Sequence, residues 1–124
     1  MKRNWVVVGA VLGLLGVALG AFGAHGIEQH VTAVERLEWW KTGVQYQLWH
    51  APVLVLLGLL QTRKPGGDLA GWCLLGGVVV FSGTLYAMTF GAPRWFGAIT
   101  PLGGLALMGG WLLLAWHARG LRTA

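Results

Sequence analysis

The side chains with the most chemical capacity in this chain are polar groups inside long apolar stretches. Thr42, Tyr46 and His50 recur at every fourth residue, so they lie on one face of a helix. Polar groups are costly in an apolar environment, where they usually mark a functional site or hydrogen bonds between helices. We expect one polar cluster, made by these residues: His25, Thr42, Gln45, Tyr46, His50, Ser82, Tyr86 and Thr100.

Metal binding and catalysis are the first chemistries to weigh for this cluster. Neutral imidazole ligates zinc, copper and haem iron, so His25, His30 and His50 are weak candidate ligands. Zinc sites normally use three or four protein ligands, however, and Cys73 is the only cysteine. Ser82 and His50 could act as nucleophile and base, but no carboxylate in the same stretches would orient the base. GxSxG, HExxH, CxxCH and Walker motifs are absent, and we predict no catalytic residue, metal or cofactor.

The residues of the polar cluster lie in four windows of the sequence that contain no charged residue. Each window is long enough to cross a bilayer as a helix, which needs ~20 apolar residues. Hydrophobic residues make up 56% of the chain and charged residues 10%, too few to cover a soluble domain. No segment alternates with a period of two, which argues against a β-barrel. The windows are Asn4–Ile27, Thr42–Thr62, Leu69–Pro93 and Trp95–Ala118.

We therefore predict an all-α integral membrane protein with four antiparallel transmembrane helices. Residues 1–124 would form a single transmembrane domain, with spans at roughly 5–25, 42–61, 69–90 and 98–117. The first span follows basic residues as a signal peptide does, but its apolar run exceeds the roughly 7–15 residues of a signal core. We expect it to remain in the protein as a span.

The basic residues predict the orientation of the spans. With a cytoplasmic N-terminus, the outer side would carry Arg36, Lys41 and Arg94. The inner side would carry more of them: Lys2, Arg3, Arg63, Lys64, Arg119 and Arg122. The positive-inside rule then places both termini in the cytoplasm. Because the net charge of +5 is dispersed, it does not predict nucleic-acid binding.

This orientation places all residues of the polar cluster in the outer half of the membrane, and leaves the inner half apolar apart from tryptophan and Cys73. A transport pathway would need polar groups across the whole membrane. Trp5 and Trp40 fit as residues at the membrane–water interfaces, whereas Trp111 lies deeper and would pack or face lipid.

The connection at residues 26–41 is the longest between two windows. Val31, Val34, Leu37 and Trp40 recur at near-helical spacing with charged residues between them. This pattern favours a short amphipathic helix on the outer surface, between the first and second spans. The alternative is a loop with frayed helical turns.

Glycine spacing in the first window predicts close helix contact. Five glycines are four, three, four and three residues apart: Gly9, Gly13, Gly16, Gly20 and Gly23. In lipid, small residues let neighbouring helices approach closely, and this contact drives association. The glycine face could contact the chain's own helices or another subunit, and we favour its own bundle.

Two interpretations of the polar cluster follow. It could be a hydrogen-bonded layer that fixes helix register in a non-catalytic structural or accessory protein, which packs with itself or a membrane partner. It could instead be an outer-leaflet pocket of a protein that binds a lipid, a quinone-like molecule or a metal. A further alternative is a small subunit of a transporter or respiratory complex.

Four motifs, taken together in their order and spacing, resemble a known family. The motifs are Gly20–Gly26, Thr42–Gln47 with His50, Phe81–Tyr86 and Ile99–Gly104. They resemble the small four-span membrane proteins grouped as domain of unknown function 423, also called YgdD-like, over nearly the whole chain. The resemblance implies a multi-pass plasma-membrane protein of bacteria, with eukaryotic relatives that include a mitochondrial type, and no established reaction, substrate or cofactor. The family's pattern includes the polar residues and first-window glycines named above.

Overall fold

A computed structural model describes residues 4–121, with Glu28 described by its backbone alone. It has four α-helices, each long and apolar enough to cross a membrane, and one short 3-10 helix. The predicted all-α membrane architecture is confirmed. The elements are α1 (Trp5–His25), η1 (Ile27–Gln29), α2 (Val34–Leu60), α3 (Asp68–Thr89) and α4 (Phe96–Ala118).

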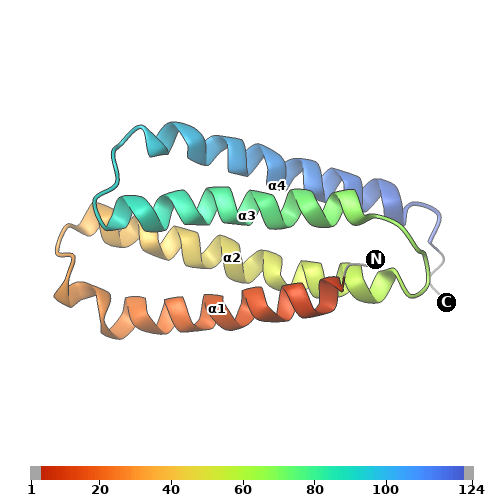
Figure 1. The fold of residues 1–124 in the computed structure, drawn as a ribbon, viewed down its shortest axis with the longest axis horizontal. Helices are drawn as coiled ribbons and strands as arrows, with labels where there is room; N and C mark the ends of the chain where they lie inside the picture. Colours follow the sequence, from red (N-terminus) through yellow and green to blue (C-terminus); the bar gives the residue numbers. More distant parts are fainter. Residues whose placement is uncertain (1–3, 122–124) are drawn as a thin grey trace.

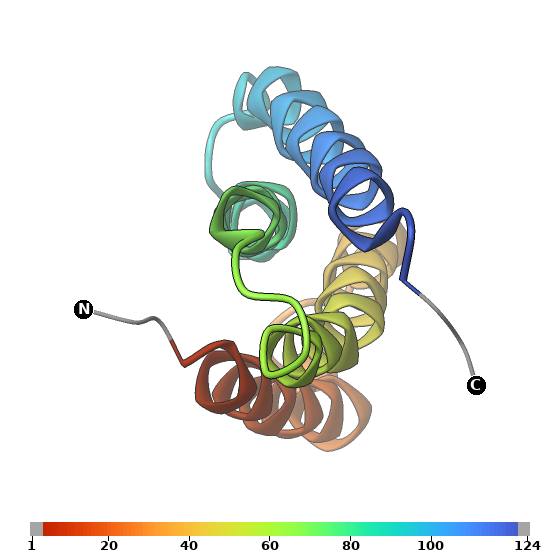
Figure 2. The same ribbon diagram turned by 90° about the vertical axis from the view of Figure 1, so that its right-hand side faces the viewer.

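The helices run antiparallel, and each packs mainly on the next one along the chain (Figure 1). Seen end-on, α1 and α2 lie together below α3 and α4 (Figure 2). We call the end that carries the α2–α3 turn (residues 61–67) the turn end; α1 begins there and α4 ends there (Figure 1). The opposite end, with η1 and the α3–α4 turn (residues 90–95), is the η1 end.

Local residue chemistry explains where the helices begin and end. Asn4 caps α1, because its side chain accepts a hydrogen bond from Val7 N at 3.2 Å. The α2–α3 turn contains Gly66 at φ 105° and Gly67 at φ 83°, a backbone conformation that favours glycine. Gly91, at φ 106°, plays the same part after α3.

The amphipathic segment before the second span is helical and continuous with α2. Residues 34–41 contain neither glycine nor proline, so nothing interrupts the helix before the apolar part begins. Ile27, Val31 and Trp40 are buried beside Val44 and form a small core at the η1 end. Of the basic residues that predict orientation, Lys2, Arg3 and Arg122 lie outside the described residues.

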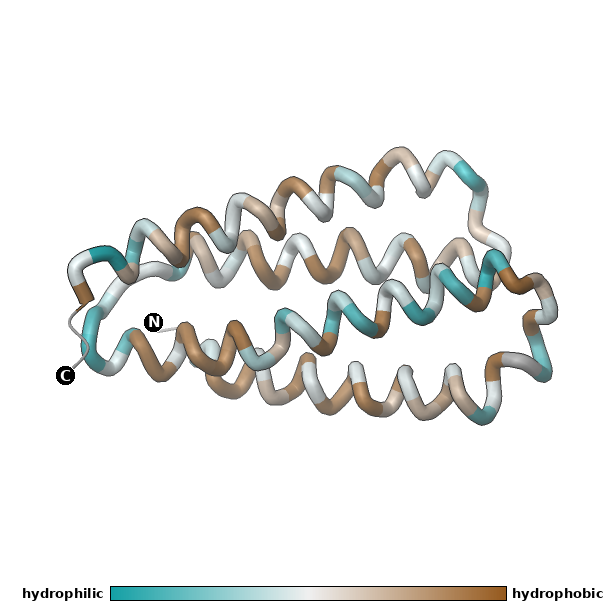
Figure 3. The backbone as a smooth tube through the Cα atoms, turned by 180° about the vertical axis from the view of Figure 1, so that it is seen from behind, coloured by the Kyte–Doolittle hydropathy of each residue, from teal (hydrophilic) through white to brown (hydrophobic). Residues whose placement is uncertain are grey.

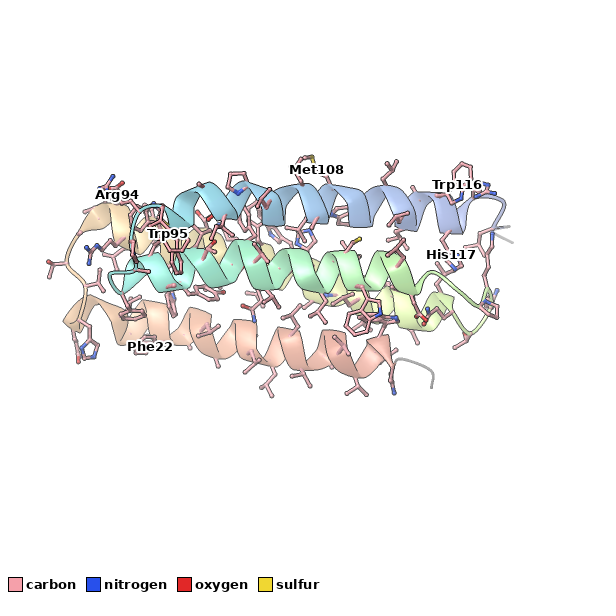
Figure 4. All side chains as sticks on the ribbon, turned by 45° about the horizontal axis from the view of Figure 1, so that its top comes forward. Phe22, Arg94, Trp95, Met108, Trp116 and His117 are labelled. Carbon is pink, nitrogen blue, oxygen red and sulfur yellow. The ribbon has the colours of Figure 1, made fainter. Side chains whose placement is uncertain are left out.

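The main core lies between the helices towards the turn end. Leu54, Leu57 and Leu74 are fully buried there, together with the Trp5 side chain. Trp5 and Trp40 are only 1% and 4% exposed, so both indoles point into the bundle rather than towards an interface. Apolar side chains also cover the outside, as Met108 on α4 shows (Figure 4). An apolar outside suits a bundle that lies in lipid.

Candidate functional site

The hydrogen bonds between helices concentrate in the half of the bundle near the η1 end, where α2 is most hydrophilic (Figure 3). Gln47 of α2 is 4% exposed and contacts two other helices. Its Nε2 donates to Leu12 O of α1 at 2.9 Å, and its Oε1 accepts from the Tyr86 hydroxyl of α3 at 2.7 Å. One side chain thus connects α1, α2 and α3.

Ser82 makes a second connection between α2 and α3. Its buried hydroxyl donates to Gly43 O at 2.7 Å. A Cβ added at Gly43 would lie 2.7 Å from Tyr86 Cε1, so glycine at this position lets the Tyr86 ring lie against α2. Ser82 Oγ therefore bonds to a backbone carbonyl and not to an imidazole, and a serine–histidine nucleophile pair is not formed here.

His50 joins α2 to α4 near the middle of the bundle. Its Nδ1 lies 2.7 Å from Tyr46 O, and Trp111 Nε1 donates to its Nε2 at 3.0 Å. An indole nitrogen can only donate and a carbonyl can only accept. We therefore assign the neutral tautomer with the proton on Nδ1. Both ring nitrogens are used within the protein.

This tautomer is directly measurable. In ¹⁵N NMR of selectively labelled protein, we expect His50 to show a protonated Nδ1 and an unprotonated Nε2. Trp111→Phe should alter the Nε2 resonance, because it removes the donor. A proton found on Nε2, or Zn²⁺-induced shifts of His50 in the native protein, would contradict the assignment.

Threonines connect α3 to its neighbours. Thr84 and Thr100 place their hydroxyl oxygens 2.6 Å apart, which links α3 to α4. Thr89 Oγ1 lies 2.8 Å from Leu85 O in its own helix and 3.2 Å from Arg36 O of α2. The polar contacts therefore involve every consecutive pair of helices.

The sequence-predicted cluster is only partly brought together. The contacts above involve these of its members: Tyr46, His50, Ser82, Tyr86 and Thr100. Thr42 is half-buried, whereas His25 and Gln45 are exposed. The weak metal candidates do not converge, since His25 and His30 are exposed near η1 and His50 is buried in α2. Within residues 4–121, no group of three or more His, Cys, Asp or Glu side chains is placed to hold a metal ion.

Sequence reasoning left Gln47 and Trp111 out of the site. An indole N–H in an apolar part of a membrane usually needs an acceptor, which is the available signal for Trp111. The same signal applies to Trp5, whose Nε1 donates to Asp68 Oδ1 at 2.8 Å at the turn end. Gln61 Nε2 donates to the same oxygen at 2.8 Å. A hollow of about 580 Å³ adjoins these three side chains.

A smaller hollow of about 280 Å³ lies between α1, η1 and α2 at the η1 end. Its wall is largely apolar and includes the small residues Gly20, Gly23 and Ala24. Gln45 and Lys41 also line it. Apolar and polar side chains therefore line this hollow together.

The glycines of α1 lie against α2, but they do so unequally. A Cβ added at Gly9 would lie 2.6 Å from Ala51 O and 2.7 Å from Val55 N, both backbone atoms. At Gly13 the nearest atom would be Ala51 Cβ, at 3.6 Å, which is ordinary contact. The added Cβ would meet side chains at the remaining positions: Gly16, Gly20 and Gly23.

Comparisons with known proteins place this geometry in context. Residues 19–104 match the model of a family described as "Protein of unknown function (DUF423)". The UPF0382 membrane protein YwdK of Bacillus subtilis is 42% identical, over 90% of this chain and 93% of its own length. A UPF0382 membrane protein of Haemophilus influenzae is 38% identical over 94% of both chains. The UPF0382 inner membrane protein YgdD of Escherichia coli is 34% identical, over 91% of this chain and 87% of its own length. No solved structure matches the chain.

Proposed function

The chain belongs to the DUF423 family of membrane proteins of unknown function, and we propose that it is a non-catalytic structural or accessory protein of the plasma membrane. Both termini would face the cytoplasm, because Arg63, Lys64 and Arg119 lie at the turn end. Its role would be to pack with a second copy or with another membrane protein.

One observation carries this proposal. Within residues 4–121, every buried side-chain nitrogen or oxygen has a hydrogen-bond partner inside the protein. A catalytic nucleophile or base needs a polar atom that can reach a substrate. The buried groups of this bundle instead bond to one another and to backbone carbonyls between helices. This arrangement supports a fixed bundle rather than a reaction centre.

The exposed face of α3 supports contact with a further helix. Gly76, Val79 and Gly83 are exposed on one side of α3, and an added Cβ at either glycine would meet nothing within 4 Å. These glycines are seven residues apart, so they lie on the same face of the helix. In lipid, a face of small residues allows close approach of another helix.

Leucine at these two glycines tests the proposed packing role. We expect the Gly76→Leu/Gly83→Leu variant to keep its fold and Tm, because both positions face open space. It should lose self-association or partner co-purification after mild detergent extraction, measured by native mass spectrometry. Gly109→Leu on α4 is the matched control, because an added Cβ there also meets nothing within 4 Å. It should change neither the Tm nor the association. A wild-type protein that is monomeric and without partners, or an association unchanged in the variant, would contradict the role.

The hollow between α1, η1 and α2 supports a second candidate function, the binding of a lipid or quinone-like molecule. Ala24→Phe would fill it from α1. Mass spectrometry of purified wild-type protein should then find one small molecule at stoichiometric amount, which the variant loses. Protein free of any such molecule in both forms would remove this candidate.

A further inference from the structure

A third hollow lies at the turn end. We propose that it binds the phosphate head group of an anionic phospholipid. The inference is independent of the proposed packing role and of which side of the membrane the turn end faces. The hollow has a volume of about 310 Å³ and lies between the turn and the last turns of α4.

The lining of this hollow combines cationic and apolar side chains. Lys64, His117 and Arg119 are its polar members, and Leu69 and Leu113 are apolar ones. Among residues 4–121, no side-chain carboxylate lines it. This combination suits a phospholipid, whose charged phosphate and apolar acyl chains are joined in one molecule. Basic pockets between transmembrane helices are known to take anionic head groups.

The two cations have no anionic partner within the described part of the chain. The ion pairs found among residues 4–121 join Lys41 to Glu38 and Arg94 to Glu35, at the η1 end. Lys64 Nζ donates to Arg119 O at 3.0 Å, which uses one of its three protons. The remaining donors are available to phosphate oxygens.

The basic side chains that line the hollow are held in place by contacts within the protein. The guanidinium of Arg119 lies 3.6 Å above the Trp116 ring, and its Nη1 donates to Trp116 O at 3.0 Å. His117 Nε2 donates to Lys64 O at 3.0 Å, because a carbonyl can only accept. Figure 4 shows His117 pointing from α4 towards the turn. The positive groups are therefore positioned before any ligand arrives.

Glycine in the turn lets the His117 ring lie close to the turn backbone. A Cβ added at Gly67 would lie 2.8 Å from His117 Cδ2, and Gly67 has a left-handed backbone. Trp116, which is 64% exposed, adds an indole beside the hollow. Indoles favour the head-group level of a bilayer. The site is thus at the depth where lipid phosphates lie, which favours a lipid over a soluble anion.

The test compares lipids on the purified wild-type protein in a neutral detergent. Phosphatidylglycerol should raise the Tm, whereas phosphatidylcholine and millimolar inorganic phosphate should not. Lys64→Gln/Arg119→Gln should weaken phosphatidylglycerol binding on the order of tenfold, as measured by native mass spectrometry. Arg36→Gln/Arg63→Gln is the matched control, since it removes the same charge from exposed residues outside the hollow.

The charge-retaining variant Lys64→Arg/Arg119→Lys should keep most of the affinity for phosphatidylglycerol. If the neutral variant does not fold, this variant is measured in its place. Equal stabilisation by phosphatidylglycerol and phosphatidylcholine would overturn the proposal. So would an equal effect of inorganic phosphate, which would indicate a simple anion site. Equal loss of affinity in the control variant would show that only net charge matters, and would also overturn it.

Discussion

Replacing Gly9 by alanine should lower the free energy of unfolding by about 3 kcal/mol, whereas Gly13→Ala should leave it unchanged or raise it. At Gly9 the added methyl group would lie 2.6 Å from Ala51 O and 2.7 Å from Val55 N. These are backbone atoms of α2, so relief requires the two helices to separate. The contact is reciprocal, because a Cβ at Gly58 of α2 would lie 2.6 Å from Val6 N of α1.

Gly13→Ala is the matched control in the same helix. Its methyl group would lie 3.6 Å from Ala51 Cβ, and alanine is favoured over glycine in a helix by ~1 kcal/mol. Denaturant unfolding in detergent, followed by circular dichroism, measures both variants. Equal stability of the two variants would contradict close packing of α1 on α2 at Gly9.

Gln47→Leu should lower the free energy of unfolding by about 1–3 kcal/mol. The substitution removes the hydrogen bonds to Leu12 O of α1 and from the Tyr86 hydroxyl of α3. It also leaves the hydroxyl of the half-buried Tyr86 without this acceptor, which is costly away from water.

Gln45→Leu offers the same chemical change two residues away. Gln45 is exposed and lies outside these contacts, so we expect little loss of stability from its substitution. Thermal unfolding of both variants in one detergent makes the comparison. A Gln47→Leu protein as stable as wild type, or a Gln45→Leu protein equally destabilised, would contradict the role of Gln47.

Much of the architecture could be predicted, because the charge-free windows record the apolar surroundings of each helix. The beginning of α2 could not. A window begins where the charged residues end, whereas the start of a helix depends on capping residues and on the positions of glycine and proline. Residues 34–41 carry charges yet lack a breaker, so α2 extends past its apolar part.

The glycine face of α1 was readable from spacing, but the unequal contacts of its members were not. Gly9 meets backbone and Gly13 has room, although both belong to the same glycine repeat. Where two helices approach most closely depends on their crossing angle and on the partner's residues, here Ala51, Val55 and Gly58. One helix's sequence does not contain this information.

For the candidate site, depth in the membrane grouped the polar residues but could not choose their partners. The face shared by Thr42, Tyr46 and His50 drew attention, whereas Gln47 lies one residue further round the helix and contacts both α1 and α3. Trp111 was assigned to packing or lipid, yet its N–H bonds to His50. Rotation of each helix about its axis decides such partners, and packing of all four helices fixes that rotation.

The most direct test of a polar layer that holds the helices together is a double-mutant cycle between Gln47 and Tyr86. Unfolding free energies of wild type, Gln47→Leu, Tyr86→Phe and the double variant give the coupling energy of the 2.7 Å hydrogen bond. We predict a favourable coupling of about 1 kcal/mol. A coupling energy of zero, with each single variant as stable as wild type, would contradict the claim that this polar layer holds the helices together.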